Sequence, residues 1–93
     1  MVLRYTYMGY KGGEIMNITI YTSSSCPWCV KAKRYLDSKN IEYREVNVSG
    51  NLLGALEMKM KSGQSAVPVI DIDGDVIVGF NKKAIDRSLA RKY

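Results

Sequence analysis

The sequence predicts one small α/β domain: a four-stranded mixed sheet with three helices, in the order βαβ followed by αββα. The first observation is size and composition, since 93 residues, 46% of them hydrophobic and 25% charged, suit one domain with one core. The second is an alternation along the chain between apolar patterns typical of strands and patterns typical of helices. The third is the order of these patterns, because a right-handed crossover makes the first two strands parallel and a tight turn makes the last two antiparallel.

The first half of this domain is predicted to be a strand, a helix and a strand. Residues 17–21 (NITIY) are β-branched and alternate in polarity, as in a strand. A cluster of serine, cysteine and proline then begins a helix that continues to about Lys39 and ends at Asn40. Residues 41–48 contain the second strand, centred on residues 43–47.

A second helix is predicted by four apolar residues that fall on one helical face and by a glycine that ends the pattern. The apolar residues are Leu52, Leu53, Leu56 and Met60, and the glycine is Gly63.

A hairpin and a last helix complete the predicted domain. Residues 68–72 and 75–78 are strands joined by Asp73-Gly74, a pair that suits a two-residue type I′ turn. Asn81 can cap the last helix, whose inward face is formed by four residues. These are Ala84, Ile85, Ser88 and Leu89.

Residues 1–15 are expected to be a mobile extension of a domain that covers residues 16–93. They show no clear periodicity. Codons for residues 11–15 can contain a purine run like that of a bacterial ribosome-binding site, at a normal distance from the Met16 codon. Met16 is therefore expected to be the natural start.

Composition narrows the classes of function. Fourteen basic and nine acidic residues give a net charge of +5, but the basic residues are spread mostly over predicted helices, which favours acidic partner proteins over nucleic acid. No apolar run approaches the roughly 20 residues of a membrane helix. No secretory signal is recognisable and no feature indicates an obligate dimer, so a cytoplasmic monomer is expected.

The two cysteines of the chain, Cys26 and Cys29, are predicted to be a redox pair. A chain with two cysteines and no histidine lacks the four ligands of a structural zinc site, so no metal site is expected. A structural disulfide is also disfavoured, because the very short loop would remove little entropy from the unfolded chain and a reducing cytosol would tend to break the bond. Redox chemistry is the remaining interpretation.

The predicted helix start assigns different roles to the two thiols. Cys26 lies where the helix begins and Pro27 suits its first turn, so free N–H groups and the positive end of the helix dipole favour the Cys26 thiolate. Cys29 is one turn further on, on the same face and more buried. Trp28 is turned away from that face and is expected to form a contact surface for a partner, with a half-buried ring as the alternative.

With these features the sequence resembles the glutaredoxins of the thioredoxin superfamily, from about Met16 to Tyr93. The resemblance rests on residues 22–29 (TSSSCPWC), beside the family's usual C-P-Y-C, and on residues 66–68 (AVP), which open the third strand. It implies a thioredoxin-like fold and a Val67–Pro68 bond that is cis and abuts the cysteine pair. It also implies that the backbone at Val67 pairs with the substrate.

The chain departs from the glutathione-using members of that family at two places. Ser23 stands where a lysine is common, and residues 79–82 (Gly79, Phe80, Asn81 and Lys82) stand where G-G-x-D is common. The resemblance makes these residues the candidate glutathione site, with glutathione as a co-substrate and no tightly bound cofactor. The Gly-Phe pair is more similar to glutaredoxin-like donors to ribonucleotide reductase, which take electrons from thioredoxin reductase.

The expected function is dithiol–disulfide exchange on protein disulfides or glutathione mixed disulfides, with Cys26 as nucleophile and Cys29 as resolving thiol. The expected reductant is glutathione or thioredoxin reductase. One alternative is a thioredoxin-reductase-linked electron donor to ribonucleotide reductase. An alternative of another class is a dimer that bridges an iron–sulfur cluster through Cys26 and external thiols, although clusters usually take four ligands.

Overall fold

The structure is a computed structural model that describes residues 10–11, 14–15 and 17–92. Within these residues it contains three helices and two groups of strands. The elements are β1 (Tyr10–Lys11), β2 (Glu14–Ile15), β3 (Ile18–Thr22), α2 (Pro27–Ser38), β4 (Arg44–Asn47), α3 (Leu52–Ser62), β5 (Val69–Ile72), β6 (Asp75–Val78) and α4 (Lys82–Lys92).

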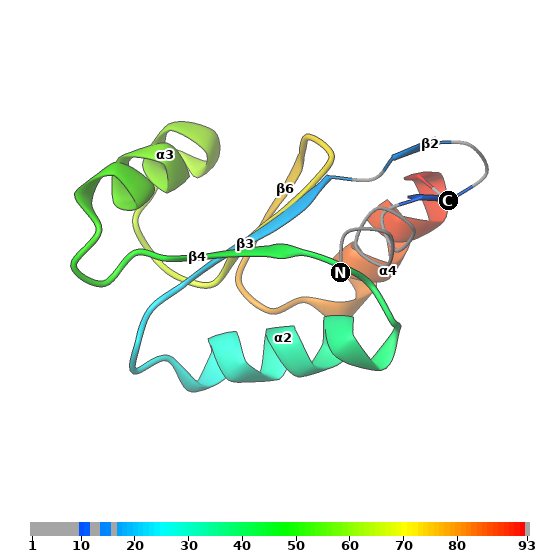
Figure 1. Cartoon of the computed structure of the whole chain (residues 1–93), viewed down its shortest axis with the longest axis horizontal. Helices are drawn as coiled ribbons and strands as arrows, with labels where there is room; N and C mark the ends of the chain where they lie inside the picture. Colours follow the sequence, from blue (N-terminus) through cyan, green and yellow to red (C-terminus); the bar gives the residue numbers. More distant parts are fainter. Residues whose placement is uncertain (1–9, 12–13, 16, 93) are drawn as a thin grey trace.

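The main sheet has the predicted mixed topology. Its strand order is β4-β3-β5-β6, with β3 and β4 parallel and the other neighbours antiparallel. Helices α2 and α4 lie on one face of this sheet and α3 lies on the other (Figure 1). The α/β fold, with three helices on a four-stranded mixed sheet, is thereby confirmed.

The central strand β3 is buried along its whole length because helices cover both faces of the sheet. Ile18 and Ile20 pack in the cluster beneath α2 and α4. Tyr21 points to the other face, where it packs with Met58 of α3 and Val69 of β5. Residues of alternating direction on one strand thus build two separate hydrophobic clusters.

Helix α3 forms where expected, but its apolar face is not the buried one. Met58 is 2% exposed and Gly54 is buried, so these residues face the sheet. A Cβ at Gly54 would lie 2.8 Å from Cγ1 of Val46, so glycine lets the helix approach β4 closely. The four apolar residues that predict the helix are exposed: Leu52 (75%), Leu53 (78%), Leu56 (48%) and Met60 (85%).

The hairpin turn and the last helix cap agree with the sequence. Asp73 and Gly74 both have positive φ, at 49° and 101°, as a type I′ turn requires. The Ala84 N–H donates to Oδ1 of Asn81 at 3.1 Å, so Asn81 caps α4.

The N-terminal extension falls mostly outside the described residues. Residues 1–9, 12–13 and 16 are not described, while β1 and β2 pair with each other as antiparallel strands. The mobility of residues 1–15 and the start at Met16 stay predictions. In the part of the chain that the structure does describe, no helix has both the length and the apolar character needed to cross a membrane.

Candidate active site

The cysteine pair lies at the junction between β3 and α2. Cys26 is the N-cap of α2, with extended backbone, and Pro27 occupies the first helical turn. The Cys29 N–H donates to the Cys26 sulfur at 3.2 Å. An N–H group at a helix start therefore donates a hydrogen bond to Cys26 Sγ, the more exposed of the two sulfurs.

The two thiols differ in exposure. Cys26 is partly exposed, whereas Cys29 is 1% exposed and shares the buried side of α2 with Ala32 and Leu36. Burial, followed by the neighbouring Cys26 sulfur, raises the pKa of Cys29 from 9.0 to about 12. An outside disulfide can thus reach Cys26, while Cys29 is shielded from it.

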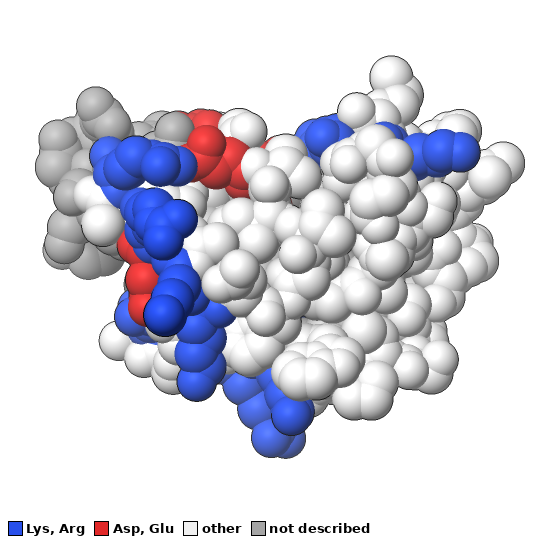
Figure 2. Space-filling view, turned by 180° about the vertical axis from the view of Figure 1, so that it is seen from behind, with Lys and Arg blue, Asp and Glu red and all other residues white. Residues whose placement is uncertain are grey.

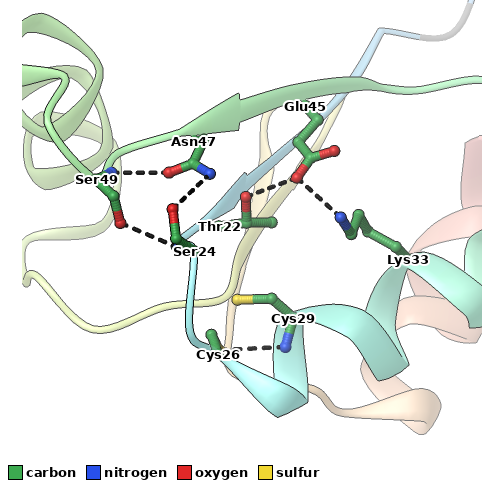
Figure 3. Close-up of polar contacts among 8 residues, drawn as sticks. All are labelled: Thr22, Ser24, Cys26, Cys29, Lys33, Glu45, Asn47 and Ser49. Atoms are coloured by element: carbon green, nitrogen blue, oxygen red, sulfur yellow. Dashed lines mark hydrogen bonds and ion pairs between the residues drawn. The ribbon is translucent and has the colours of Figure 1, made fainter.

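The turn before Cys26 is held by residues that the sequence did not single out. The Ser24 N–H donates to Oγ of Ser49 at 3.0 Å, and Nδ2 of Asn47 donates to Oγ of Ser24 at 3.3 Å (Figure 3). The Ser49 N–H in turn donates to Oδ1 of Asn47 at 2.9 Å. No spacing in the sequence marks this set, because it depends on the parallel pairing that brings Thr22 opposite Asn47.

The loop before β5 lies against the first cysteine. The Val67–Pro68 peptide bond is cis, as the resemblance implies. Sγ of Cys26 lies 4.0 Å from the carbonyl oxygen of Val67, and Pro68 is buried. The carbonyl of Pro68 accepts from the Gly79 N–H at 2.8 Å, which brings the loop after β6 to the same place. Val67 therefore contacts Cys26 directly, and Gly79 is joined to the next residue of the same loop, Pro68.

An aromatic group borders the site. The choice between a contact surface and a half-buried ring stays open for the Trp28 ring, because this residue is 56% exposed. Its centroid lies 6.4 Å from that of Phe80, which lies 5.8 Å from that of Tyr35. The ammonium of Lys31 lies 4.5 Å from the Trp28 centroid. These rings and the lysine form an apolar and cationic border next to the cysteines.

The remaining candidate glutathione residues, Ser23, Asn81 and Lys82, have their contacts mainly with groups other than Cys26. Oδ1 of Asn81 is engaged as the cap of α4, and the ammonium of Lys82 lies 5.5 Å from the Tyr35 ring centroid. Ser23 is half-buried, and its main-chain N–H acts on the Cys29 sulfur. The partners of Asn81 and Lys82 among the described residues thus lie on α4 and α2, and not at Cys26.

A charged pair lies behind the cysteines and was also missed by sequence reasoning. Nζ of Lys33 lies 3.0 Å from Oε2 of Glu45, and the hydroxyl of Thr22 donates to the same oxygen at 2.8 Å. Burial opposes ionisation of Glu45, but these two hydrogen bonds hold its pKa below the ordinary value. The pair joins α2 to β4 across the end of β3 (Figure 3).

Charge is distributed unevenly around the molecule. Basic side chains gather along the left side and the bottom of the view in Figure 2, with others at the upper right, around a broad area without charged side chains. Helix α4 supplies four exposed basic residues, namely Lys82, Lys83, Arg87 and Arg91. Among the described residues there is no group of three or more side chains of the types that hold a metal ion.

Comparisons with known proteins agree with the fold. The family model described as Glutaredoxin matches residues 18–77. An uncharacterized glutaredoxin-like 8.6 kDa protein in the rubredoxin operon of Clostridium pasteurianum is 51% identical over 74 residues, which cover 80% of this chain and 99% of that protein. Glutaredoxin 3 of Escherichia coli is 41% identical over 63 residues, covering 68% of this chain and 76% of that protein.

A solved structure, the glutaredoxin-like protein NrdH-redoxin from Escherichia coli, superposes with a TM-score of 0.66 and 28% sequence identity. The superposition covers 76% of this chain and 92% of that one, and that protein is described as having a thioredoxin-like activity profile.

Proposed function

The chain belongs to the glutaredoxin family, and we propose that it is a dithiol–disulfide oxidoreductase that uses Cys26 and Cys29. In the first step the Cys26 thiolate attacks a substrate disulfide, forms a mixed disulfide and releases one substrate thiol. In the second step Cys29 attacks Cys26 Sγ, which releases the reduced substrate and leaves a Cys26–Cys29 disulfide. Such a cycle suits a reducing compartment such as the cytoplasm.

One observation carries this proposal: the Cys29 N–H donates to Cys26 Sγ at 3.2 Å while the Cys29 side chain itself is buried. The first thiol is thereby favoured as a nucleophile, and the second is within one helical turn yet protected. A two-step exchange needs this division of roles.

Cysteine variants test the proposal. Cys26→Ser should abolish turnover with every disulfide, since no nucleophile remains. Cys29→Ser should retain turnover with glutathione mixed disulfides, which can be resolved by a second glutathione, and lose turnover with protein disulfides. The measurement is NADPH oxidation coupled through glutathione reductase or thioredoxin reductase. Equal activity of Cys26→Ser and the unaltered protein would refute the proposal.

For the reductant, we propose that a thioredoxin reductase is at least as effective as glutathione. Glutathione carries two carboxylates, which bind best through charge-assisted hydrogen bonds. Ser23 provides no cation, Asn81 is occupied as a cap, and Phe80 fills space next to Trp28. The similarity to NrdH-redoxin, which is described as having a thioredoxin-like activity profile, also supports thioredoxin reductase as the reductant.

The two reductants can be compared directly at matched concentrations of the oxidised protein. The proposal expects slow reduction by glutathione and reduction at least as fast by thioredoxin reductase. Rapid turnover with glutathione, and none with any thioredoxin reductase tried, would show that glutathione is the reductant.

A further inference from the structure

The second step of exchange requires a proton to leave a buried thiol. Cys29 is 1% exposed, and its burial is the largest cause that raises its pKa to about 12. The Cys26 sulfur is the next cause, through its hydrogen bond and its charge. A thiol with such a pKa has almost no thiolate near neutral pH, so an unassisted second step would be slow.

Two groups oppose this rise in the pKa of Cys29. They are the main-chain N–H of Ser23 and the positive charge of Lys33, and each lowers the pKa of the thiol. Lys33 lies four residues after Cys29 in α2, so both side chains leave the helix on the same side. In Figure 3 the Cys29 sulfur points from α2 toward the sheet, on the side where the Lys33 side chain also extends.

The ammonium of Lys33 is held in place from two other elements. Oε2 of Glu45 on β4 lies 3.0 Å from Nζ, and the same oxygen accepts from the hydroxyl of Thr22, which is 1% exposed at the end of β3. A lysine free in solvent would lose much of its field to screening by water and salt. The contact with Glu45 keeps the charge on the cysteine side of the sheet.

The first step changes the balance of charges at Cys29. Once Cys26 is part of a mixed disulfide it is no longer a thiolate, so its negative charge no longer opposes ionisation of Cys29. Of the charges that act on Cys29, that of Lys33 on α2 remains, and its partner Glu45 on β4 carries a negative charge that offsets part of its field. Beside them stand uncharged donors from the end of β3, the Ser23 N–H and the Thr22 hydroxyl.

We propose that the Lys33 ammonium, positioned by Glu45 and Thr22, stabilises the Cys29 thiolate as it forms in the second step of exchange. This inference rests on the proposed function and adds a supporting residue to it. Lys33 does not react. The Cys29 thiol gives up its proton to solvent, its sulfur forms a bond to Cys26 Sγ, and the bond between Cys26 and the substrate sulfur breaks with the electron pair going to the substrate thiolate.

The two steps can be followed separately with dithiobis-nitrobenzoate, which releases a coloured thiolate at each step. One equivalent is mixed rapidly with the reduced protein, and absorbance reports a first phase from attack by Cys26 and a second from attack by Cys29. Lys33→Met, which keeps the length of the side chain, should leave the first phase within about twofold of normal. It should slow the second phase about three- to fourfold for each unit by which the Cys29 pKa rises, because a tenfold loss of thiolate is partly offset by the greater nucleophilicity of the more basic thiolate. It should also move the pH midpoint of that phase upward.

Two further variants separate charge from structure. Lys33→Arg keeps the positive charge and should restore most of the second-phase rate. Lys39→Met removes a lysine at the C-terminal end of α2, just after the helix, that is also paired with a carboxylate, Asp86, and it should leave both phases unchanged. Circular dichroism of each variant checks that the fold is retained.

The proposal is overturned if Lys33→Met has a normal second phase with an unshifted pH midpoint. It is also overturned if both phases slow equally, or if Lys39→Met slows the second phase as much. These results differ from failure of the proposed function, in which the unaltered protein itself would release only one coloured thiolate per chain.

Discussion

At the scale of single residues, the feature on which the proposed function rests is the difference between two thiols one helical turn apart. Cys26 is partly exposed and accepts an N–H from the helix start, whereas Cys29 is packed inside the buried side of α2. The helix start supplies hydrogen bonds to one sulfur, and the core removes water from the other. The same short segment therefore presents one partly exposed thiol and one buried thiol, as the proposed two-step exchange requires.

Alkylation should report this difference. Iodoacetamide near neutral pH is expected to label Cys26 first and to leave Cys29 largely unlabelled in the folded, reduced protein. Because the pKa of Cys29 is raised to about 12, the thiol stays protonated in the fold as the pH passes 9, and its labelling should grow only as the pH approaches 12. Peptide mass spectrometry locates the label.

Unfolding in denaturant provides the control, since it should make the two cysteines equally reactive at one pH. Faster labelling of Cys29 than of Cys26 in the folded protein would reverse the proposed roles.

At the scale of elements, α3 shows that helical periodicity does not tell which face of a helix is buried. Its leucines and Met60 predict the helix correctly, yet the face toward the sheet consists of Gly54 and Met58. Met58 packs with Tyr21 and Val69, so this narrow face holds α3 in place.

Two methionines of α3 provide a matched test of this orientation. Met58→Ala is expected to lower the free energy of unfolding by about 2–5 kcal/mol, the range for large-to-small changes in a core. Met60→Ala, two residues away and 85% exposed, should change it by less than about 0.5 kcal/mol. Urea denaturation measures both. A larger loss for Met60→Ala than for Met58→Ala would mean that α3 is turned the other way.

Much of the fold could be predicted because the signals are local. The alternation in residues 17–21, the turn at Asp73-Gly74 and the cap at Asn81 each depend on a few neighbouring residues, and the structure agrees with each. The side of α3 that is buried could not be predicted, since it depends on how closely Gly54 can approach β4.

In the candidate site, too, residues in local motifs could be predicted, whereas contacts between elements could not. Cys26, Cys29 and Pro68 belong to short motifs, and the structure brings Cys26 to the loop before Pro68. The contact of Lys33 with Glu45 joins two elements, and only the packing of α2 on β4 brings them together. Contacts of this kind cannot be predicted from the spacing of residues along the chain.

At the scale of the whole molecule, the main sheet and its three helices lie within residues 18–92, and the family model matches within the same part. Both helices of the α2/α4 layer and the single helix of the other layer pack on this sheet. Among the described residues, the members of the two hydrophobic clusters all come from Ile18 onward.

A protein that begins at Met16 should therefore fold and act as the full chain does. Its thermal midpoint is expected to stay within about 4 °C, which corresponds to less than about 1 kcal/mol for a domain of this size. Thermal denaturation and the coupled NADPH assay measure the two properties. A clearly lower midpoint or turnover would show that residues 1–15 contribute to the domain, against the prediction from the sequence.

The central claim is that Cys26 attacks first and Cys29 resolves, and trapping the intermediate tests it most directly. Reduced Cys29→Ser and Cys26→Ser proteins are each incubated with glutathione disulfide and analysed by intact-mass spectrometry. The account predicts that Cys29→Ser gains one glutathionyl group on Cys26, that Cys26→Ser gains almost none, and that the unaltered protein accumulates the Cys26–Cys29 disulfide instead. A glutathionyl group that appears readily on Cys29 of Cys26→Ser, and not on Cys26 of Cys29→Ser, would contradict it.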